Sequence, residues 1–275
     1  MKARQLLLIG AALALAACGG HQVRDSGPPS GSVRIPDLPG DPVPRPEPRS
    51  RYGNGPVYEV LGKRYEVMDS SAGYRERGVA SWYGKKFHGN LTSNREPYDM
   101  YAMTAAHKTL PLPTYVRVRN LRNDRSIVVR VNDRGPFVHN RIIDLSYAAA
   151  LKLDMIEDGT SLVEVTAISF DEPSGDRPVR KASPAAPPQP SDQPAAPPHR
   201  VFVQVGAFGE RANAERRLSA LTVAGLGNAF IHEERSPGDV LYRVRIGPVR
   251  DVVQYDLIVD QLEAIGIADP YLITE

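Results

Sequence analysis

Hydrophobic and polar positions alternate in short runs along two stretches of the chain, and these runs predict two folded units. In the first stretch, four runs rich in β-branched residues are separated by Gly, Pro and Asn, as is typical of short strands and turns. A short helix is predicted at 147–153, with Ser146 as its N-cap. Several short strands within about 90 residues favour a small closed barrel. The predicted strands cover residues 79–83, 115–119, 127–131 and 162–165.

The second stretch predicts the order β-α-β-β-α-β, which is that of the ferredoxin-like split β-α-β arrangement. Its second helix is expected to stop at Gly266. RNA-binding modules share this fold, but the chain shows no basic and aromatic signature of the kind they use. Strands are predicted at 201–205, 229–234, 240–246 and 271–273, and helices at 210–224 and 251–264.

Proline placement divides the chain around these units. Of 25 prolines, nine lie between Pro28 and Pro56 and nine between Pro173 and Pro198. Such stretches cannot bury a core and favour extended polyproline conformation. The predicted organisation is multidomain, with a signal peptide at 1–17, a tether at 18–76, a mainly-β domain at 77–170, a linker at 171–199 and an α+β domain at 200–275. Residues 57–77 are ambiguous, because Tyr58, Tyr65 and Tyr74 could pack on the edge of the mainly-β domain.

The first residues read as a secretory signal, with Lys2 and Arg4 before an apolar run from Leu6 to Ala17. The run is shorter than the roughly 20 apolar residues that span a bilayer. Leu-Ala-Ala-Cys at its end resembles the bacterial lipobox, which implies lipidation of Cys18; a plain signal peptide is the alternative. By the same resemblance, Gly19 in place of aspartate implies the outer membrane facing the periplasm.

Composition narrows the remaining classes. A formal charge of +2 over 275 residues gives no electrostatic case for nucleic acid. Cys18 is the only cysteine, so the chain forms no internal disulfide. The six histidines lack metal-ligand spacing, and we predict neither a metal nor a cofactor.

Motifs in the two units resemble a known family. The first unit is similar to the six-stranded double-psi β-barrel of rare lipoprotein A, a family of septal-ring lytic transglycosylases. The second resembles the sporulation-related repeat (SPOR) domain, which implies binding to peptidoglycan glycan stripped of its stem peptides. The first resemblance rests on residues 78–84, 87–89, 98–100, 103–111, 131–136 and 141–146, and the second on 203–208 and 242–248.

The first resemblance implies an enzyme that cleaves the bond after N-acetylmuramic acid without water, leaving a 1,6-anhydro end. One carboxyl suffices for this reaction, and Asp133, which follows a predicted strand at a Gly-Pro turn, is our candidate acid/base. Arg130 and Arg134 are close in sequence, and positive charge opposes an acid role. The assignment therefore requires that both arginines point away or that burial outweighs them. A purely structural turn is the alternative for Asp133.

Glu96 and His107 match supporting positions of the family; Glu96 could hold a proton or a sugar hydroxyl, and His107 could orient a carboxylate or be structural. Arg95 stands where the family usually has glycine, a costly exchange if φ is positive there. Asp144 is expected to brace the barrel, or to be the second carboxylate of a hydrolase.

Aromatic side chains are candidates for stacking on sugar rings. Trp82 and Tyr83 are adjacent in one strand, so one should point inward and the other outward. We favour Tyr83 for the groove. In the C-terminal unit, Gln204, Phe208 and Arg243 are the expected glycan contacts, and Phe208 could equally belong to the core.

Taken with the resemblance, these features predict a carbon–oxygen lyase recruited to peptide-free glycan at the division septum. Septal division proteins are candidate partners. Two alternatives stay open: a non-catalytic, expansin-like protein that only grips glycan, and an inverting hydrolase that uses Asp133 with Asp144 or Glu96.

Overall fold

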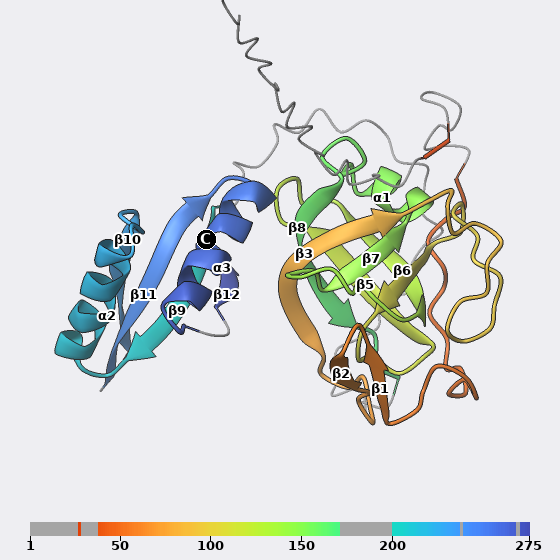
Figure 1. The fold of residues 1–275 in the computed structure, drawn as a ribbon, viewed down its shortest axis with the longest axis horizontal. Helices are drawn as coiled ribbons and strands as arrows, with labels where there is room; N and C mark the ends of the chain where they lie inside the picture. The colour runs from red at the N-terminus through yellow and green to blue at the C-terminus, as the bar shows by residue number, and fades with distance from the viewer. Residues whose placement is uncertain (1–26, 29–37, 171–199, 237–238, 268–269) are drawn as a thin grey trace, which may run out of the picture.

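The structure is a computed structural model that describes residues 27–28, 38–170, 200–236, 239–267 and 270–275. The predicted signal peptide, Cys18 and the linker at 171–199 lie outside the described residues. Two units stand side by side (Figure 1). Within the described ranges, no helix is long and apolar enough to cross a membrane.

The first unit is a closed six-stranded barrel, as predicted. Its strand order is β3-β7-β4-β6-β5-β8, and the pairs β3–β7 and β4–β6 are parallel while the other pairs are antiparallel. This is the double-psi arrangement. The strands are β3 (Arg75–Tyr83), β4 (Thr104–His107), β5 (Thr114–Asn120), β6 (Ser126–Asp133), β7 (Ile143–Ser146) and β8 (Thr160–Ala167).

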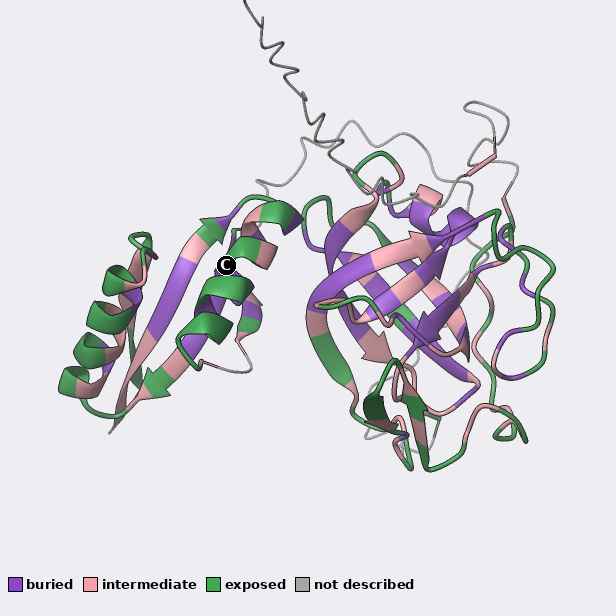
Figure 2. Ribbon diagram, in the orientation of Figure 1, coloured by how far each residue is buried: buried purple, intermediate pink, exposed green. Residues whose placement is uncertain are grey.

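The barrel interior is filled by side chains that alternate along each strand with outward-facing residues. The first residues of β3 are exposed, whereas its second half is buried or half-buried (Figure 2). Helix α1 (Tyr147–Lys152) begins where predicted, because the Ser146 hydroxyl accepts a hydrogen bond from the Ala149 amide at 3.2 Å. Fully buried aliphatic side chains of this core include Leu110, Leu112, Ile143, Leu145 and Leu153.

The C-terminal unit confirms the β-α-β-β-α-β order. Its antiparallel sheet has the strand order β10-β11-β9-β12. Helix α3 ends just before Gly266, which has a φ of +73° that glycine adopts without strain. The elements are β9 (Val201–Phe208), α2 (Arg211–Val223), β10 (Ala229–Ser236), β11 (Asp239–Val249), α3 (Val252–Ala264) and β12 (Tyr271–Thr274).

The N-terminal part of the chain differs from the predicted tether. Residues 38–56, here called the strap, run along the barrel wall, and β1 (Val57–Val60) pairs with β2 (Lys63–Glu66) as a hairpin beside it (Figure 1). Asn54 exchanges hydrogen bonds with the backbone of Leu112, at 2.6 and 2.8 Å. Contacts of this kind supply the free energy that proline-rich sequence cannot obtain from a core of its own.

Helix α3 faces the barrel and joins the two units. Asp256 accepts two hydrogen bonds from the Arg141 guanidinium, at 3.1 and 3.0 Å, and one from the Asn140 side chain at 2.6 Å. Barrel residues Val79, Leu121 and Leu162 share one buried apolar cluster with α3. The two units therefore make both apolar and charged contacts.

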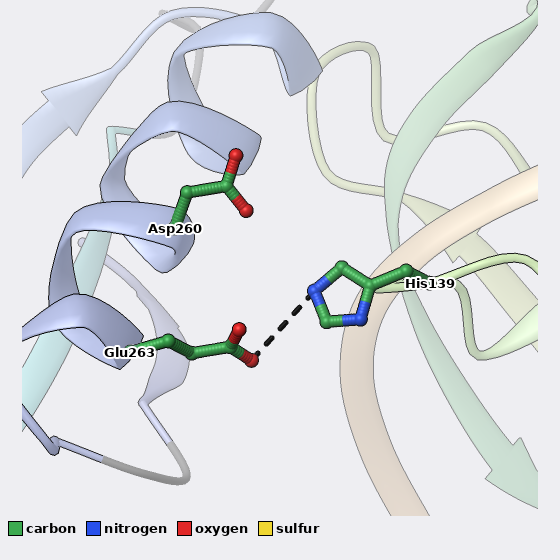
Figure 3. Close-up of side chains that lie close together, drawn as sticks. All are labelled: His139, Asp260 and Glu263. Atoms are coloured by element: carbon green, nitrogen blue, oxygen red, sulfur yellow. Dashed lines mark ion pairs between the residues drawn. The ribbon is translucent and has the colours of Figure 1, made fainter. Parts of the chain in front are cut away.

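A second charged contact lies along the same helix (Figure 3). His139 of the barrel forms an ion pair with Glu263 at 3.6 Å, and Asp260 lies beside them. The potential ligand atoms of these three side chains lie within 4.8 Å of one another, but all three residues are exposed, and we assign no metal to them.

Candidate active site

Two acidic residues lie in one register row across the outer face of the barrel. Ala106 on β4 is paired with Asp133 on one side and with Asp144 on the other. Asp144 in turn is paired with Ser81 on β3. Neighbouring strands lie about 4.8 Å apart, so the Cα atoms of the two acids are separated by about 10 Å. Ala106 between them has only a methyl group and is itself buried.

Asp133 is the last residue of β6 and is held through one oxygen. Its Oδ1 accepts hydrogen bonds from the Ser93 amide at 2.8 Å, the Ser93 hydroxyl at 2.6 Å and the Arg134 amide at 2.8 Å. Among the described residues, none donates a hydrogen bond to Oδ2. The carboxyl group is thus fixed in orientation, with Oδ2 left for a ligand.

The two arginines near Asp133 point away from it, as a catalytic role requires. The Arg130 guanidinium pairs with Glu96 and Glu47, at 2.7 and 2.8 Å. The Arg134 guanidinium donates to backbone carbonyls, among them Leu110 O at 2.6 Å, and forms no ion pair within the described residues. The structural alternative for Asp133 also has a basis, because its carboxylate does cap two backbone amides.

Glu96 contacts β6 through Arg130 and Asn132. Its Oε2 accepts from Arg130 at 2.7 Å and from the Asn132 side chain at 2.9 Å. Burial by itself raises the pKa of Glu96, but these hydrogen bonds outweigh burial and hold the pKa below its ordinary value. Glu96 is therefore an ionised acceptor suited to a sugar hydroxyl rather than a group that stores a proton.

Arg95 does occupy the left-handed region, with a φ of +72°. The cost of that conformation for a residue with a Cβ is about 1–2 kcal/mol. Its guanidinium lies over the ring of Tyr52 in the strap, 4.7 Å from the centroid, which offsets part of that cost.

His107 is buried, and both of its ring nitrogens form hydrogen bonds within the barrel domain. Its Nδ1 accepts from the amides of Thr109 and Leu110, at 3.2 and 3.0 Å, so its Nε2 carries the proton and donates to Tyr74 Oη at 2.7 Å. Burial, with the charges of Arg134 and Lys108, lowers its pKa to about 3. The neutral imidazole fixes the turn whose carbonyls hold Arg134.

Asp144 is the most shielded acid of the row. The Ser81 hydroxyl donates to its Oδ1. Gly135 packs close to its Oδ2, since a methyl group in place of the Gly135 hydrogen would lie 3.9 Å from that oxygen. Burial raises the pKa of Asp144, although Ser81, Arg141 and Lys108 lower it in part. Asp144 thus favours the protonated form more than an exposed aspartate does.

Trp82 and Tyr83 point in opposite directions. Trp82 is paired with the core residue Leu145 and packs edge-on against Tyr147, with ring centroids 5.8 Å apart. Tyr83 is on the side of the acids, is buried, and stacks on Tyr98 at 4.2 Å. Burial and the neighbouring acids raise its pKa, so the phenol stays neutral.

The expected glycan contacts of the C-terminal unit are divided between the two faces of its sheet. Arg243 lies on the face without helices and pairs with Glu234. Gln204 is on the same face but only 1% exposed, because Tyr271 and Arg245 bond to its side chain. Phe208 lies on the helix side, where the Arg217 guanidinium is 6.0 Å from its ring.

Several residues of these two surfaces were missed by the sequence reasoning. Arg245 lies two residues after Arg243 in one strand, so strand alternation alone could have placed it on the same face. Ser93, which holds Asp133, carried no signal, because its partner is 40 residues away. Glu47, Tyr52 and Asn54 in the strap had none either.

Two family models match the chain. The family described as "Lytic transglycolase" matches residues 75–165, and the SPOR domain matches residues 197–274. The strap and the β1–β2 hairpin precede the first matched range.

Two bacterial relatives that share one name match the chain as well. The chain is 38% identical over 284 residues to "Endolytic peptidoglycan transglycosylase RlpA" of Pseudomonas aeruginosa, which covers 87% of this chain and 81% of that protein. It is 55% identical over 141 residues to the protein of that name in Vibrio cholerae, covering 51% of this chain and 53% of the relative. Among solved structures, the RlpA SPOR domain from Pseudomonas aeruginosa is 26% identical, with a TM-score of 0.25, and covers 26% of this chain and 96% of that one.

Proposed function

Because the chain belongs to the RlpA family of endolytic peptidoglycan transglycosylases, we propose that it cleaves peptide-free glycan strands after N-acetylmuramic acid and leaves 1,6-anhydro ends. The observation that carries this proposal is the geometry of Asp133. One carboxyl stands at the end of a barrel strand with Oδ1 held by three donors, while Oδ2 receives no hydrogen bond from the described residues.

Asp133 acts first as an acid and then as a base. Protonated at Oδ2, it gives its proton to the glycosidic oxygen as the C1–O bond breaks. The resulting carboxylate then takes the proton of the C6 hydroxyl, whose oxygen bonds to C1 and closes the anhydro ring. No water enters the products, and Asp133 ends the cycle protonated. The amides of Ser93 and Arg134 hold the carboxyl in place throughout.

The helix-free face of the SPOR sheet supports recruitment to glycan. Arg243 there offers donors to sugar oxygens, and Tyr271 offers an aromatic ring that is 49% exposed, while the buried Arg245 bonds to Gln204 and Glu275 and holds this face together. We assign the anchor to a lipid on Cys18, the location to the outer membrane facing the periplasm, and the site of action to the septum. These assignments follow from the lipobox resemblance and the SPOR domain.

A specific observation favours a second candidate, an inverting hydrolase. Asp133 and Asp144 flank Ala106, and an inverting pair needs carboxyl groups about 6.5–9.5 Å apart, with a water between them.

Product end-groups test both candidates. Peptide-free glycan is digested with the chain from Gly19 onward, and with Asp133→Asn, and the products are read by mass spectrometry. Products with 1,6-anhydro ends that are absent with Asp133→Asn support the transglycosylase. New reducing ends would support the hydrolase. Intact glycan that still co-sediments with both proteins would leave a non-catalytic glycan-binding protein.

A further inference from the structure

A cavity of about 300 Å³ opens beside Asp133. Two of its wall residues, Ser93 and Arg134, are those that hold the Asp133 carboxyl. Whatever occupies the cavity is therefore adjacent to the catalytic group. The full lining is Gly53, Gly55, Tyr58, Val60, Ser93, Arg134 and Phe137, so the strap and β1 supply four of the seven wall residues.

The cavity wall contains a cation without a counter-charge. Arg134 donates to Gly53 O, His107 O, Leu110 O and Asn54 Oδ1, at 2.6 to 3.1 Å, and all four acceptors are neutral. These bonds leave one N–H of Nη2 without an acceptor among the described residues. A partly buried charge without an ion partner is costly, and an anionic ligand reduces that cost.

Neighbouring charges make the region more attractive to an anion. The positive charge of Arg49 lies close enough to Arg134 to lower its pKa, and the charges of Lys108 and Arg134 lower the pKa of His107. These cations together make the region electropositive. The neighbouring carboxyl that acts on Arg134 is Asp133, and it is the group that must carry the proton during catalysis.

The rest of the wall is apolar. Tyr58, Tyr65 and Phe137 form a cluster with ring centroids 5.2 to 6.3 Å apart. The Tyr58 hydroxyl donates to Lys108 O at 2.8 Å, so its polar atom is already bonded, and the Arg134 guanidinium lies 5.8 Å from the ring centroid. The site thus suits a small group that combines a methyl with a negative charge.

We propose that this cavity binds the D-lactyl ether of a peptide-free N-acetylmuramic acid, with Arg134 as the counter-charge of its carboxylate. The inference rests on the proposed function and deepens it. In a strand that still carries stem peptides, the lactyl carboxyl is an amide without charge, so Arg134 gains no ion partner. Selection of peptide-free glycan is then a property of the barrel as well as of the SPOR domain.

The test compares two substrates that differ in this charge alone. Peptide-free glycan is used as it is, or after its lactyl carboxyls have been converted to methylamides with a carbodiimide and methylamine. With the chain from Gly19 onward, kcat/KM for cleavage is expected to be at least tenfold lower on the amidated glycan.

Two variants at one position assign that preference to the cavity. Val60→Asp places a carboxylate in the cavity wall, where it pairs with Arg134 and repels the lactyl group; Val60→Asn has the same shape without charge. Val60→Asp is expected to bring the ratio of the two kcat/KM values close to one, by slowing cleavage of the charged glycan about tenfold. Val60→Asn is expected to keep the ratio.

Each other outcome has a distinct meaning. Equal cleavage of both substrates by the unmodified chain would overturn the inference and leave the proposed function standing. A preference that survives in Val60→Asp would also overturn it, since the preference would then arise in the SPOR domain. Absence of cleavage of either substrate would overturn the proposed function, and the inference with it.

Discussion

Asp133 and Asp144 lie on the same face of the barrel with only the methyl group of Ala106 between them in the register. Their surroundings differ. Asp133 has one oxygen held by three donors, whereas Asp144 is shielded and its pKa is raised mainly by burial. This difference gives the two carboxyls separate roles.

We expect Asp133→Asn and Asp144→Asn to differ in activity. Loss of a general acid lowers the rate by about 10²–10⁴-fold, so Asp133→Asn should show a loss of that size with glycan binding intact. Asp144→Asn should retain cleavage with 1,6-anhydro ends, because the transglycosylase reaction needs one carboxyl. Turnover and product ends measured by mass spectrometry check both. Equal losses in the two variants would favour the hydrolase.

Asp144 also predicts a dependence of stability on pH. A raised pKa in the folded state means that folding favours the protonated carboxyl. The contribution of Asp144 to the free energy of unfolding is therefore complete at low pH and is lost as pH rises through the folded-state pKa. Asp144→Asn removes this loss. The free energy of unfolding of the variant, relative to the original chain, should therefore improve between pH 3.5 and pH 7 in urea titrations. A constant difference would contradict the raised pKa.

His107 predicts the opposite dependence. Because its pKa is lowered to about 3 in the folded chain, its contribution is present above the unfolded value of about 6.5 and is lost as pH falls. The slope amounts to about 1.4 kcal/mol per pH unit below that value. His107→Gln should abolish this slope, whereas His139→Gln, at an exposed position, should leave it. Urea titrations at pH 4, 5 and 7 measure the slopes.

Arg95 predicts that glycine is better tolerated than alanine. Both Arg95→Gly and Arg95→Ala lose the contact with Tyr52, but only glycine relieves the positive φ. Arg95→Gly should therefore be more stable than Arg95→Ala by about 1 kcal/mol. Thermal denaturation of the two variants side by side checks this. Equal stabilities would mean that the turn relaxes to another conformation.

The contact between the units predicts rescue by charge reversal. Arg141→Asp or Asp256→Arg alone places like charges together and should separate the units, which small-angle scattering detects as a larger radius of gyration. The double variant restores an ion pair of reversed polarity and should return the radius toward the original. The coupling energy expected for such a partly exposed pair is about 1 kcal/mol. Additive effects of the two changes would show that the apolar contacts alone join the units.

Local pattern was sufficient to predict four of the six barrel strands and the elements of the C-terminal unit, whereas β4 and β7, of four residues each, were not predicted. Alternating β-branched residues mark β3, β5, β6 and β8, Ser146 marks the start of α1 and Gly266 the end of α3, because these signals lie within a few positions of the element they specify. Ser146 illustrates this, since its predicted cap is present.

The sequence could not predict features that depend on distant partners. The strap reads as an unstructured tether because its partners are far along the chain; Glu47, for example, pairs with Arg130, 83 positions later. Gln204 reads as a surface residue, but neighbouring strands bury it. Gln204 and Phe208 are four positions apart in β9, so regular alternation would place both on the same face of the sheet. An irregularity in the pairing of β9 with β11 moves Phe208 to the opposite face.

The strap also determines how far the catalytic barrel can stand from its proposed anchor at Cys18. A free tether up to Arg77 would allow a separation of about 200 Å at full extension. Since the chain is bound to the barrel from Leu38 onward, where that side chain packs against the core, only about 20 residues remain, and they cannot span more than about 70 Å. The position at which the strap binds the barrel thus limits the distance between the proposed membrane anchor and Asp133. Glycan farther from the membrane than this distance cannot be reached by Asp133.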